Sequence, residues 1–314
     1  MFKRKRPPAG LILIIGLFLL NLISPSLVMA QGFAGISLVP PKFELFANPG
    51  STINESIKVT NSSDSPQTFT VYVEDFRSSG EEGQVVLEES GGEEYSLMTW
   101  ITPSAESIVL QPEEQVIFPF SINVPKNAEP GGHYASLLFT IGSGEAGPGV
   151  TAVQHRVGAL ILLRVSGDVV EDGQIETFDI PKYSKKGPIT MSLRIKNNGT
   201  THIRPEGTII ISSIFGKKVA EIPLNGLNVF PGAVRKMDTQ WDKENIFGYY
   251  TATIVSTYGQ QNLPLTASSR FFVISTTALI LIILGLISLA IFISSAIKGK
   301  SRILKAIKII FTGN

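Results

Sequence analysis

The residues that could carry out catalysis or bind a metal are few in this chain and lie far apart. The sequence contains no cysteine, so it forms neither a thiol nucleophile nor a thiolate metal site. Its three histidines, His133, His155 and His202, do not occur in an HExxH or similar metal-binding spacing. The sequence also lacks a G-x-S-x-G nucleophile elbow and a phosphate-binding G-x-x-x-x-G-K-[ST] loop. These absences argue against the common hydrolase and nucleotide-binding classes, and we expect no bound cofactor.

Adjacent carboxylates are the remaining candidates for acid–base chemistry or calcium binding. They form four glutamate pairs, at positions 81–82, 88–89, 93–94 and 113–114. Neighbouring residues of a strand point to opposite faces, and no D-x-D-x-D-G calcium loop is present. We therefore expect a solvated hairpin in the Gly/Ser-rich segment Ser78–Glu94, with cation binding at 80–94 as the alternative. Trp100 and Trp241 are expected to be core residues, and the chain is expected not to be an enzyme.

The longest apolar stretch in the chain runs from Phe271 to Ile297. It has 27 residues and no charged side chain. As a helix rising about 1.5 Å per residue it would reach about 40 Å, more than the hydrocarbon core of about 30 Å. A core helix of a soluble domain usually stops at about 10–14 apolar residues. The stretch therefore predicts a single transmembrane helix with its ends at Phe271 and Ile297.

The residues after this stretch predict its orientation. The segment Lys298–Asn314 holds five Lys or Arg residues and no acid. A positive flank stays on the cytoplasmic side, which places the chain before Phe271 outside the cell membrane. The mixture of cations and aliphatic residues in this tail fits either a short helix on an anionic leaflet or a solvated tail.

The N-terminus has the three parts of a secretory signal peptide. Lys3–Arg6 is basic, Leu11–Leu20 is apolar, and Val28–Ala30 offers small or aliphatic residues before a cleavage point. Cleavage between Ala30 and Gln31 is expected, and an uncleaved signal anchor is the alternative. Both give the same topology.

The segment between signal and anchor is acidic. All 26 Asp and Glu residues lie in residues 31–270, against 18 Lys and Arg, which gives a net charge of −8. The absence of cysteine, and hence of disulfides, favours a bacterial surface over an animal one. Three N-x-[ST] triplets begin at Asn54, Asn61 and Asn198 in turn contexts, and glycosylation is not expected there. A nucleic-acid partner is not expected either.

Composition divides this segment near Gly167–Asp168. Residues 31–168 have a net charge of −11 and residues 169–270 a net charge of +3. Short runs rich in Val, Ile, Phe and Thr, separated by Gly, Pro, Asn and Asp, are typical of antiparallel sandwiches. The sequence thus predicts an all-β protein of two immunoglobulin-like β-sandwiches in tandem, 31–168 and 169–270, followed by one transmembrane α-helix.

Individual strands can be predicted from their patterns. Val116–Val124 is apolar at every second position, and Pro119 on its outward face indicates an edge strand or a bulge. Val157–Val165 is almost continuously apolar and should be central. Further strands are expected at 53–60, 68–76, 107–110 and 134–141. Ser56–Asn61 resembles Ser192–Asn197, which we interpret as one hairpin repeated in both domains, with convergent turn chemistry as the alternative.

The order of parts resembles the WxL-interacting proteins of Gram-positive cell surfaces. Local matches are Pro49–Gly50 followed by Ile57–Asn61, and Pro125 followed by Gly131–Tyr134. The resemblance implies that the first domain associates with peptidoglycan, that the second associates with host proteins, and that the pair gathers surface proteins carrying WxL motifs. It carries over no binding residue. The first domain also resembles periplasmic pilus chaperones in its strand–Asn–strand opening, although those chaperones are soluble.

Two functions follow as expectations. The first is a membrane-anchored bacterial surface protein that binds or scaffolds cell-wall polymer and secreted surface proteins. The second is a membrane-tethered chaperone or assembly factor that binds secreted subunits by β-strand addition.

Overall fold

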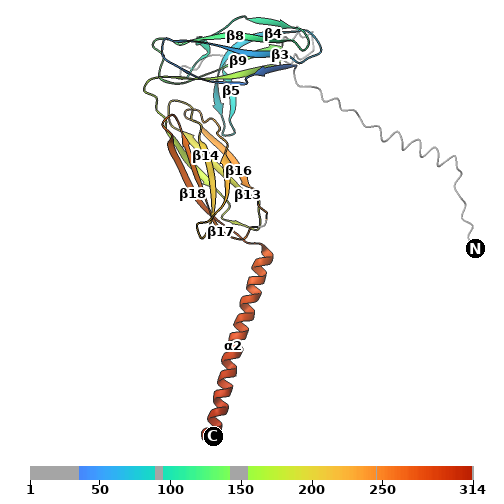
Figure 1. The fold of residues 1–314 in the computed structure, drawn as a ribbon, viewed down its shortest axis with the longest axis vertical. Helices are drawn as coiled ribbons and strands as arrows, with labels where there is room; N and C mark the ends of the chain where they lie inside the picture. Colours follow the sequence, from blue (N-terminus) through green and yellow to red (C-terminus); the bar gives the residue numbers. More distant parts are fainter. Residues whose placement is uncertain (1–34, 89–94, 142–154, 245, 313–314) are drawn as a thin grey trace, which may run out of the picture.

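The computed structural model describes residues 35–88, 95–141, 155–244 and 246–312. Two β-sandwiches follow one another and lead into one long C-terminal helix (Figure 1). This arrangement confirms the expected all-β fold of immunoglobulin-like sandwiches with an apolar helix after them. The expected signal peptide, with its cleavage residues Ala30 and Gln31, lies outside the described residues.

The first sandwich is built from two sheets. One has the strand order β1 (Ile36–Val39), β3 (Thr52–Asn61), β8 (Gln115–Asn123), β6 (Ile101–Pro103). The other has the order β2 (Lys42–Ala47), β10 (Arg156–Val165), β9 (Gly131–Ile141), β4 (Gln67–Ser79), β5 (Gln84–Glu88), and β7 (Ser107–Leu110) also pairs with β4. A 3₁₀ turn, η1 (Met98–Trp100), precedes β6.

Alternation along β8 places its apolar residues in the core, as expected. Phe118, Phe120 and Ile122 are buried, while Ile117, directly before Phe118, is exposed. Two edge-to-face ring pairs join the sheets: Phe120 with Phe43, and Phe118 with Phe139, each at 5.3 Å between ring centroids. Edge-to-face aromatic pairs add stability beyond their buried area.

Pro119 lies in β8 just beyond the point where the short strand β6 stops pairing with it. β8 pairs with β3 along its length but with β6 only from Phe120 to Ile122. The Pro119 carbonyl accepts a hydrogen bond from the Ser104 amide at 3.1 Å, on the side away from β3. A residue's N–H and C=O point to the same side of a strand, so the missing N–H of Pro119 also faces that side and costs no bond to β3. β8 is thus open at one end rather than an edge strand throughout.

The nearly continuous apolar run of β10 has two buried faces. Ala159, Ile161 and Leu163 point into the core of the first sandwich. Leu162, on the opposite face, belongs to a second cluster that also contains Phe76 and Tyr134. β10 lies between β2 and β9, as its pattern predicted.

The second sandwich also consists of two sheets. One has the strand order β11 (Gly173–Asp179), β13 (Ile189–Asn197), β16 (Val234–Trp241). The other has the order β12 (Tyr183–Ser184), β18 (Leu263–Val273), β17 (Gly248–Tyr258), β14 (Glu206–Ser213), β15 (Lys218–Leu224). Trp241 is buried in this core beside Tyr250 and Phe271. Trp100 of the first sandwich is only partly buried, and its ring lies 4.4 Å from that of His133.

The expected repeat is a repeated hydrogen-bonding device. The buried amide of Asn61 donates to the Ser65 and Leu110 carbonyls at 2.9 and 3.0 Å. The buried amide of Asn197 donates to the Thr201 and Val229 carbonyls, both at 2.8 Å. In each case the side-chain oxygen accepts the amide N–H two residues later. Each asparagine thereby joins its own turn to a distant segment of the same sandwich.

The chain after the second sandwich differs from the prediction at the start of the apolar stretch. Phe271 lies in β18, pairs with Tyr250 and is buried in the core, so it is not the start of the membrane span. The helix α2 (Thr276–Thr312) starts after Ser275, whose hydroxyl accepts the Ala278 amide at 3.1 Å as an N-cap. Ile297 lies inside this helix, which continues through the basic segment to Thr312. The predicted start was wrong because an apolar strand and an apolar helix adjoin without a polar linker, while Ile297 as the end of the span stays a prediction.

The helix contains one candidate membrane span, Thr276–Ser295, by length and composition. Its 20 residues would extend about 30 Å as a helix, the thickness of a hydrocarbon core. None of this window is buried against protein, so its apolar side chains are all available to lipid. This fits single-pass anchoring.

Candidate functional site

The residues singled out for chemistry lie in separate places. His133 is buried in β9, with its two ring nitrogens each 3.0 Å from a backbone carbonyl oxygen, of Ser96 and of Glu129. His155 is exposed before β10, and His202 lies between the two sandwiches. Within the described residues no group of three His, Cys, Asp or Glu side chains could hold a metal ion. The structure does not bring these histidines together.

The glutamate pairs have separate structural roles. Glu81 and Glu82 lie at the tip of the β4–β5 hairpin, and Glu88 pairs with Arg77 across that hairpin. Glu114 accepts the Gln111 amide at 2.7 Å in the turn before β8. Positions 89, 93 and 94 lie outside the described residues. The described glutamates thus lie in separate turns and hairpins, and they do not form a pair of facing carboxylates that could act as acid and base.

The sequence predicted a solvated hairpin in this segment. In the structure the β4–β5 hairpin instead contacts the second sandwich (Figure 1). Glu81 forms a two-pronged ion pair with Arg194 of β13, with 2.8 Å between Nε and the carboxylate. The Glu81 carbonyl also accepts the Lys236 amide at 2.8 Å, and the Glu82 carboxylate lies 3.8 Å from the Lys236 ammonium. The acidic tip therefore docks on basic residues of β13 and β16.

An aromatic cluster fills the junction behind this hairpin. The ring of Phe230 lies 5.0 Å from that of Tyr134 and 5.5 Å from that of Phe76, both in edge-to-face geometry. Phe230 comes from the second sandwich and the other two rings from the first. Leu160 and Leu162 of β10 also belong to the cluster. Burial of this apolar surface holds the two sandwiches together.

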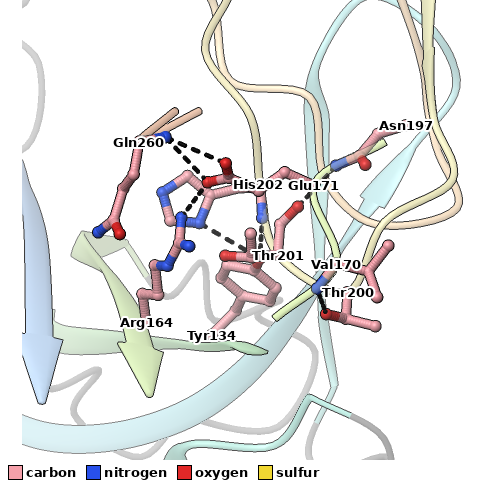
Figure 2. Close-up of polar contacts among 9 residues, drawn as sticks. All are labelled: Tyr134, Arg164, Val170, Glu171, Asn197, Thr200, Thr201, His202 and Gln260. Atoms are coloured by element: carbon pink, nitrogen blue, oxygen red, sulfur yellow. Dashed lines mark hydrogen bonds and ion pairs between the residues drawn. The ribbon is translucent and has the colours of Figure 1, made fainter. Parts of the chain in front are cut away.

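Polar contacts around the linker fix the same junction (Figure 2). The Tyr134 hydroxyl accepts the His202 amide at 2.8 Å, and the Gly132 amide donates to the Thr200 carbonyl at 2.8 Å. Gly131, with φ +134°, passes so close to Thr200 that an added Cβ would lie 2.6 Å from its carbonyl oxygen. This close approach requires glycine.

The linker between β10 and β11 is bonded to both sandwiches. Glu171, between β10 and β11, forms an ion pair with Arg164 at the end of the first sandwich. Both its carboxylate oxygens lie 3.1 Å from the Gln260 amide, in the β17–β18 turn of the second sandwich (Figure 2). One carboxylate thus ties the two sandwiches through the chain that joins them.

Burial at this junction shifts two pKa values. Burial lowers the pKa of His202 to about 4; the Glu44 carboxylate opposes this shift, and Arg164 and Lys42 reinforce it. Burial likewise raises the pKa of the Tyr134 phenol well above its usual range. Both groups are thus neutral over the physiological range. Because neither pKa approaches neutrality, the pair is suited to structure rather than to proton transfer.

A small cavity of about 200 Å³ opens beside the aromatic cluster. Phe76, Tyr134 and Phe230 line its apolar side, and the Arg77–Glu88 ion pair lies on its rim. Ligand pockets of enzymes usually enclose about 300–1,000 Å³. This cavity is of the size of one amino-acid side chain.

An open sheet edge is the clearest binding feature of the first sandwich. β2 pairs in parallel with β10 on one side only, and Pro41 and Ala47 accept hydrogen bonds from Leu160 and Ser166. Odd-numbered residues of β2 therefore point their backbone groups at β10. By the same alternation, the backbone groups of Lys42, Glu44 and Phe46 point away from it and have no backbone partner among the described residues.

The edge continues onto β10 itself. β2 covers β10 only from Leu160 onward, so Arg156–Ala159 is paired on the β9 side alone. The side chains of β2 alternate, with Phe43 and Ala47 buried and Phe46 exposed. An extended peptide pairing here would find free backbone donors and acceptors and an exposed apolar side chain.

Neither the junction nor this edge was anticipated from the sequence. The doubly apolar run of β10 was a usable signal for the junction, since a sandwich strand facing solvent on one side would alternate. The break between β1 and β2 was signalled by Pro40–Pro41, because proline cannot donate to a ladder. Long-range contacts such as that between Glu81 and Arg194 carry no local pattern.

Comparison with known proteins gives fold relatives alone. No family model matches the chain, and no curated protein matches it. Among solved structures, the class 5 fimbriae chaperone CfaA is 13% identical, with a TM-score of 0.39 over 75% of this chain and 98% of that one. The YadV chaperone is 9% identical, with a TM-score of 0.36 over 76% and 100%.

A third structure shows such a chaperone with a partner. It is the CsuC–CsuE chaperone–tip adhesion subunit pre-assembly complex of Acinetobacter baumannii. It is 13% identical, with a TM-score of 0.35 over 64% of this chain and 89% of that one. These three likenesses concern the immunoglobulin-like fold alone.

Proposed function

We propose that this chain is a membrane-anchored, non-enzymatic assembly factor whose first sandwich captures an extended segment of a secreted or surface protein by β-strand addition. The observation that carries the proposal is the open edge formed by β2 and the start of β10. Three residues of β2 direct unpaired backbone groups outward, and edge strands are sites where another chain adds readily. Cell-wall polymer is the other partner class that the anchored topology would suit.

The rigid junction supports this function. Strand addition depends on an edge held in a fixed conformation, because ordering both partners on binding would reduce affinity. The Glu44 carboxylate, on β2, accepts the Asn228 amide of the second sandwich at 2.9 Å. Although burial raises the pKa of Glu44, the Asn228 amide and Lys42 outweigh it and hold that pKa below its usual range. The edge is thus braced by the neighbouring domain.

Phe46→Pro tests the open edge. The Phe46 amide points outward, so proline removes a donor needed by an added strand without breaking a bond to β10. Phe46→Thr keeps that donor and removes the same aromatic ring. We expect the full chain with Phe46→Thr to retain secreted and surface proteins from its own host in a pull-down, and Phe46→Pro to lose them at least about tenfold.

Two results would contradict strand addition at β2. One is equal capture by the proline and threonine variants when circular dichroism shows both to be folded. The other is retention of purified wall polymer by the wild-type chain with no protein partner, which would favour the scaffolding function.

A further inference from the structure

The end of the second sandwich next to α2 carries exposed aromatic and basic residues. Three loops meet there: residues 180–188, residues 214–217, and the β16–β17 connection with residues 242–244 and 246–247. The strand register places them together, since Gly248 pairs with Val273 immediately before the helix and Ser213 pairs with Tyr250. β12, inside the first loop, pairs with Phe272 and Val273. We name these three loops the membrane-proximal end (Figure 1).

Several apolar side chains at this end are exposed to solvent. Phe215 is 93% exposed and Ile214 is 67% exposed at the tip of the β14–β15 turn. Phe247 is 60% exposed on the β16–β17 connection. Tyr183 is also exposed, and its hydroxyl donates to the Ile274 carbonyl at 3.2 Å. Isolated exposed apolar residues are ordinary, but these gather around the start of a membrane span.

The same end is basic on an otherwise acidic molecule. The three loops contain five lysines, at 182, 185, 186, 217 and 243, and two acids, Asp242 and Glu244. Their net charge of +3 contrasts with the net charge of −8 for residues 31–270. All five lysines are exposed. Lysine and aromatic side chains together are typical of surfaces that lie in the headgroup region of an anionic bilayer.

The short connection to the helix holds this end close to the bilayer. β18 ends at Val273 and α2 begins at Thr276, so only Ile274 and Ser275 lie between them. Two extended residues span about 7 Å at most. The Ile274 amide donates to the Ser184 carbonyl at 3.1 Å, and the Gly187 amide to the Glu244 carbonyl at 3.1 Å. The loop 180–188 is therefore bonded both to the connection and to the β16–β17 connection.

We propose that the membrane-proximal end lies in the headgroup layer of an anionic phospholipid bilayer, with Ile214, Phe215 and Phe247 at the acyl boundary and the lysines on the lipid phosphates. The first sandwich, with a net charge of −11 over residues 31–168, is then repelled from that surface. The first sandwich then lies farther from the bilayer than the second (Figure 1). The inference rests on the anchoring part of the proposed function.

A cysteine reporter can measure this contact, because the chain has no cysteine of its own. Ile214→Cys places an environment-sensitive fluorophore at the membrane-proximal end of the full chain in vesicles. Gln261→Cys, an exposed position in the turn at the opposite end of the same sandwich, is the control. Lipids carrying a nitroxide near the headgroup should quench the fluorophore at 214 several-fold more than at 261.

The lipid charge is tested in the same preparation. Quenching at 214 should increase when part of the phosphatidylcholine is replaced by phosphatidylglycerol. Lys186→Gln should weaken that increase, whereas Lys126→Gln, on an exposed lysine of the first sandwich, should not. Equal quenching at 214 and 261 would overturn the contact, and equal quenching with neutral and anionic lipid would overturn the role of the phosphates. Partner capture by the Phe46 variants in detergent is independent of both outcomes.

Discussion

At the scale of single residues, the molecule uses polar side chains as buried connectors. From a fully buried position, Asn61 and Asn197 each donate to a carbonyl of their own turn and to one of a distant segment. The Tyr134 hydroxyl connects the two sandwiches, since it accepts the His202 backbone amide at 2.8 Å. Tyr134 and His202, which are titratable, stabilise the folded state in the neutral form that burial favours.

His202 should make the junction sensitive to acid. Its pKa is about 4 in the folded chain and about 6.5 when unfolded, so the unfolded state binds a proton first as the pH falls. Stability is therefore fully present above about pH 6.5 and decreases down to about pH 4, by about 3 kcal/mol at most. Chemical denaturation of the full chain in detergent at both pH values would measure this loss.

The matched variant is His202→Gln, which cannot take up a proton. Between the two pH values, the free energy of unfolding of this variant should fall by less than that of the wild type. The difference between the two losses should be about 3 kcal/mol. Wild type and variant losing equal stability would mean that the acid sensitivity comes from other groups.

At the scale of elements, strands with two buried faces explain the arrangement of the molecule. β9 is buried from Gly131 to Thr140, and β10 has apolar residues on both sides. One face of each packs in the first core and the other faces the second sandwich or the aromatic cluster. The β4–β5 hairpin adds a charged contact to this apolar one, through Glu81 and Arg194.

Glu81→Ala should loosen the hairpin from the second sandwich. It removes both prongs of the ion pair to Arg194 while leaving the backbone bond from the Lys236 amide in place. We expect a broader distribution of distances between spin labels on the two sandwiches, with little change in the mean. Glu82→Ala is the control, since Glu82 is exposed and lies 3.8 Å from Lys236. Identical distributions for the two variants would show that the aromatic cluster alone sets the junction.

The elements also show how far the sequence leads. Alternation in β8 and the asparagine-ended strands were predictable, because period and turn chemistry are local. The start of the membrane helix was not, because Phe271 and Val273 continue the apolar pattern of β18 directly into α2. The open edge of β2 and the docked hairpin were also missed. Both depend on which strands meet across the fold, and no local pattern records that.

At the scale of the whole molecule, charge is distributed along one axis. Residues 31–168 have a net charge of −11, residues 169–270 have +3, and the helix ends in a segment with five further cations and no acid. The first sandwich lies farthest from the helix, and the second lies between them (Figure 1). Basic residues close to one end of a span keep that end in the cytoplasm. We therefore infer that both sandwiches lie outside the cell.

Cysteine labelling in intact cells would test this topology. Gln261→Cys should react with a membrane-impermeant maleimide in intact cells, because it lies in an exposed turn of the second sandwich. Ser301→Cys, in the basic segment after the span, should react only after the membrane is permeabilised. The reverse pattern would place the β2 edge in the cytoplasm. The edge could then not bind a partner that has already been secreted. Labelling of both positions in intact cells would mean that α2 does not cross the bilayer, and neither the anchored assembly factor nor the lipid contact of the second sandwich would then hold.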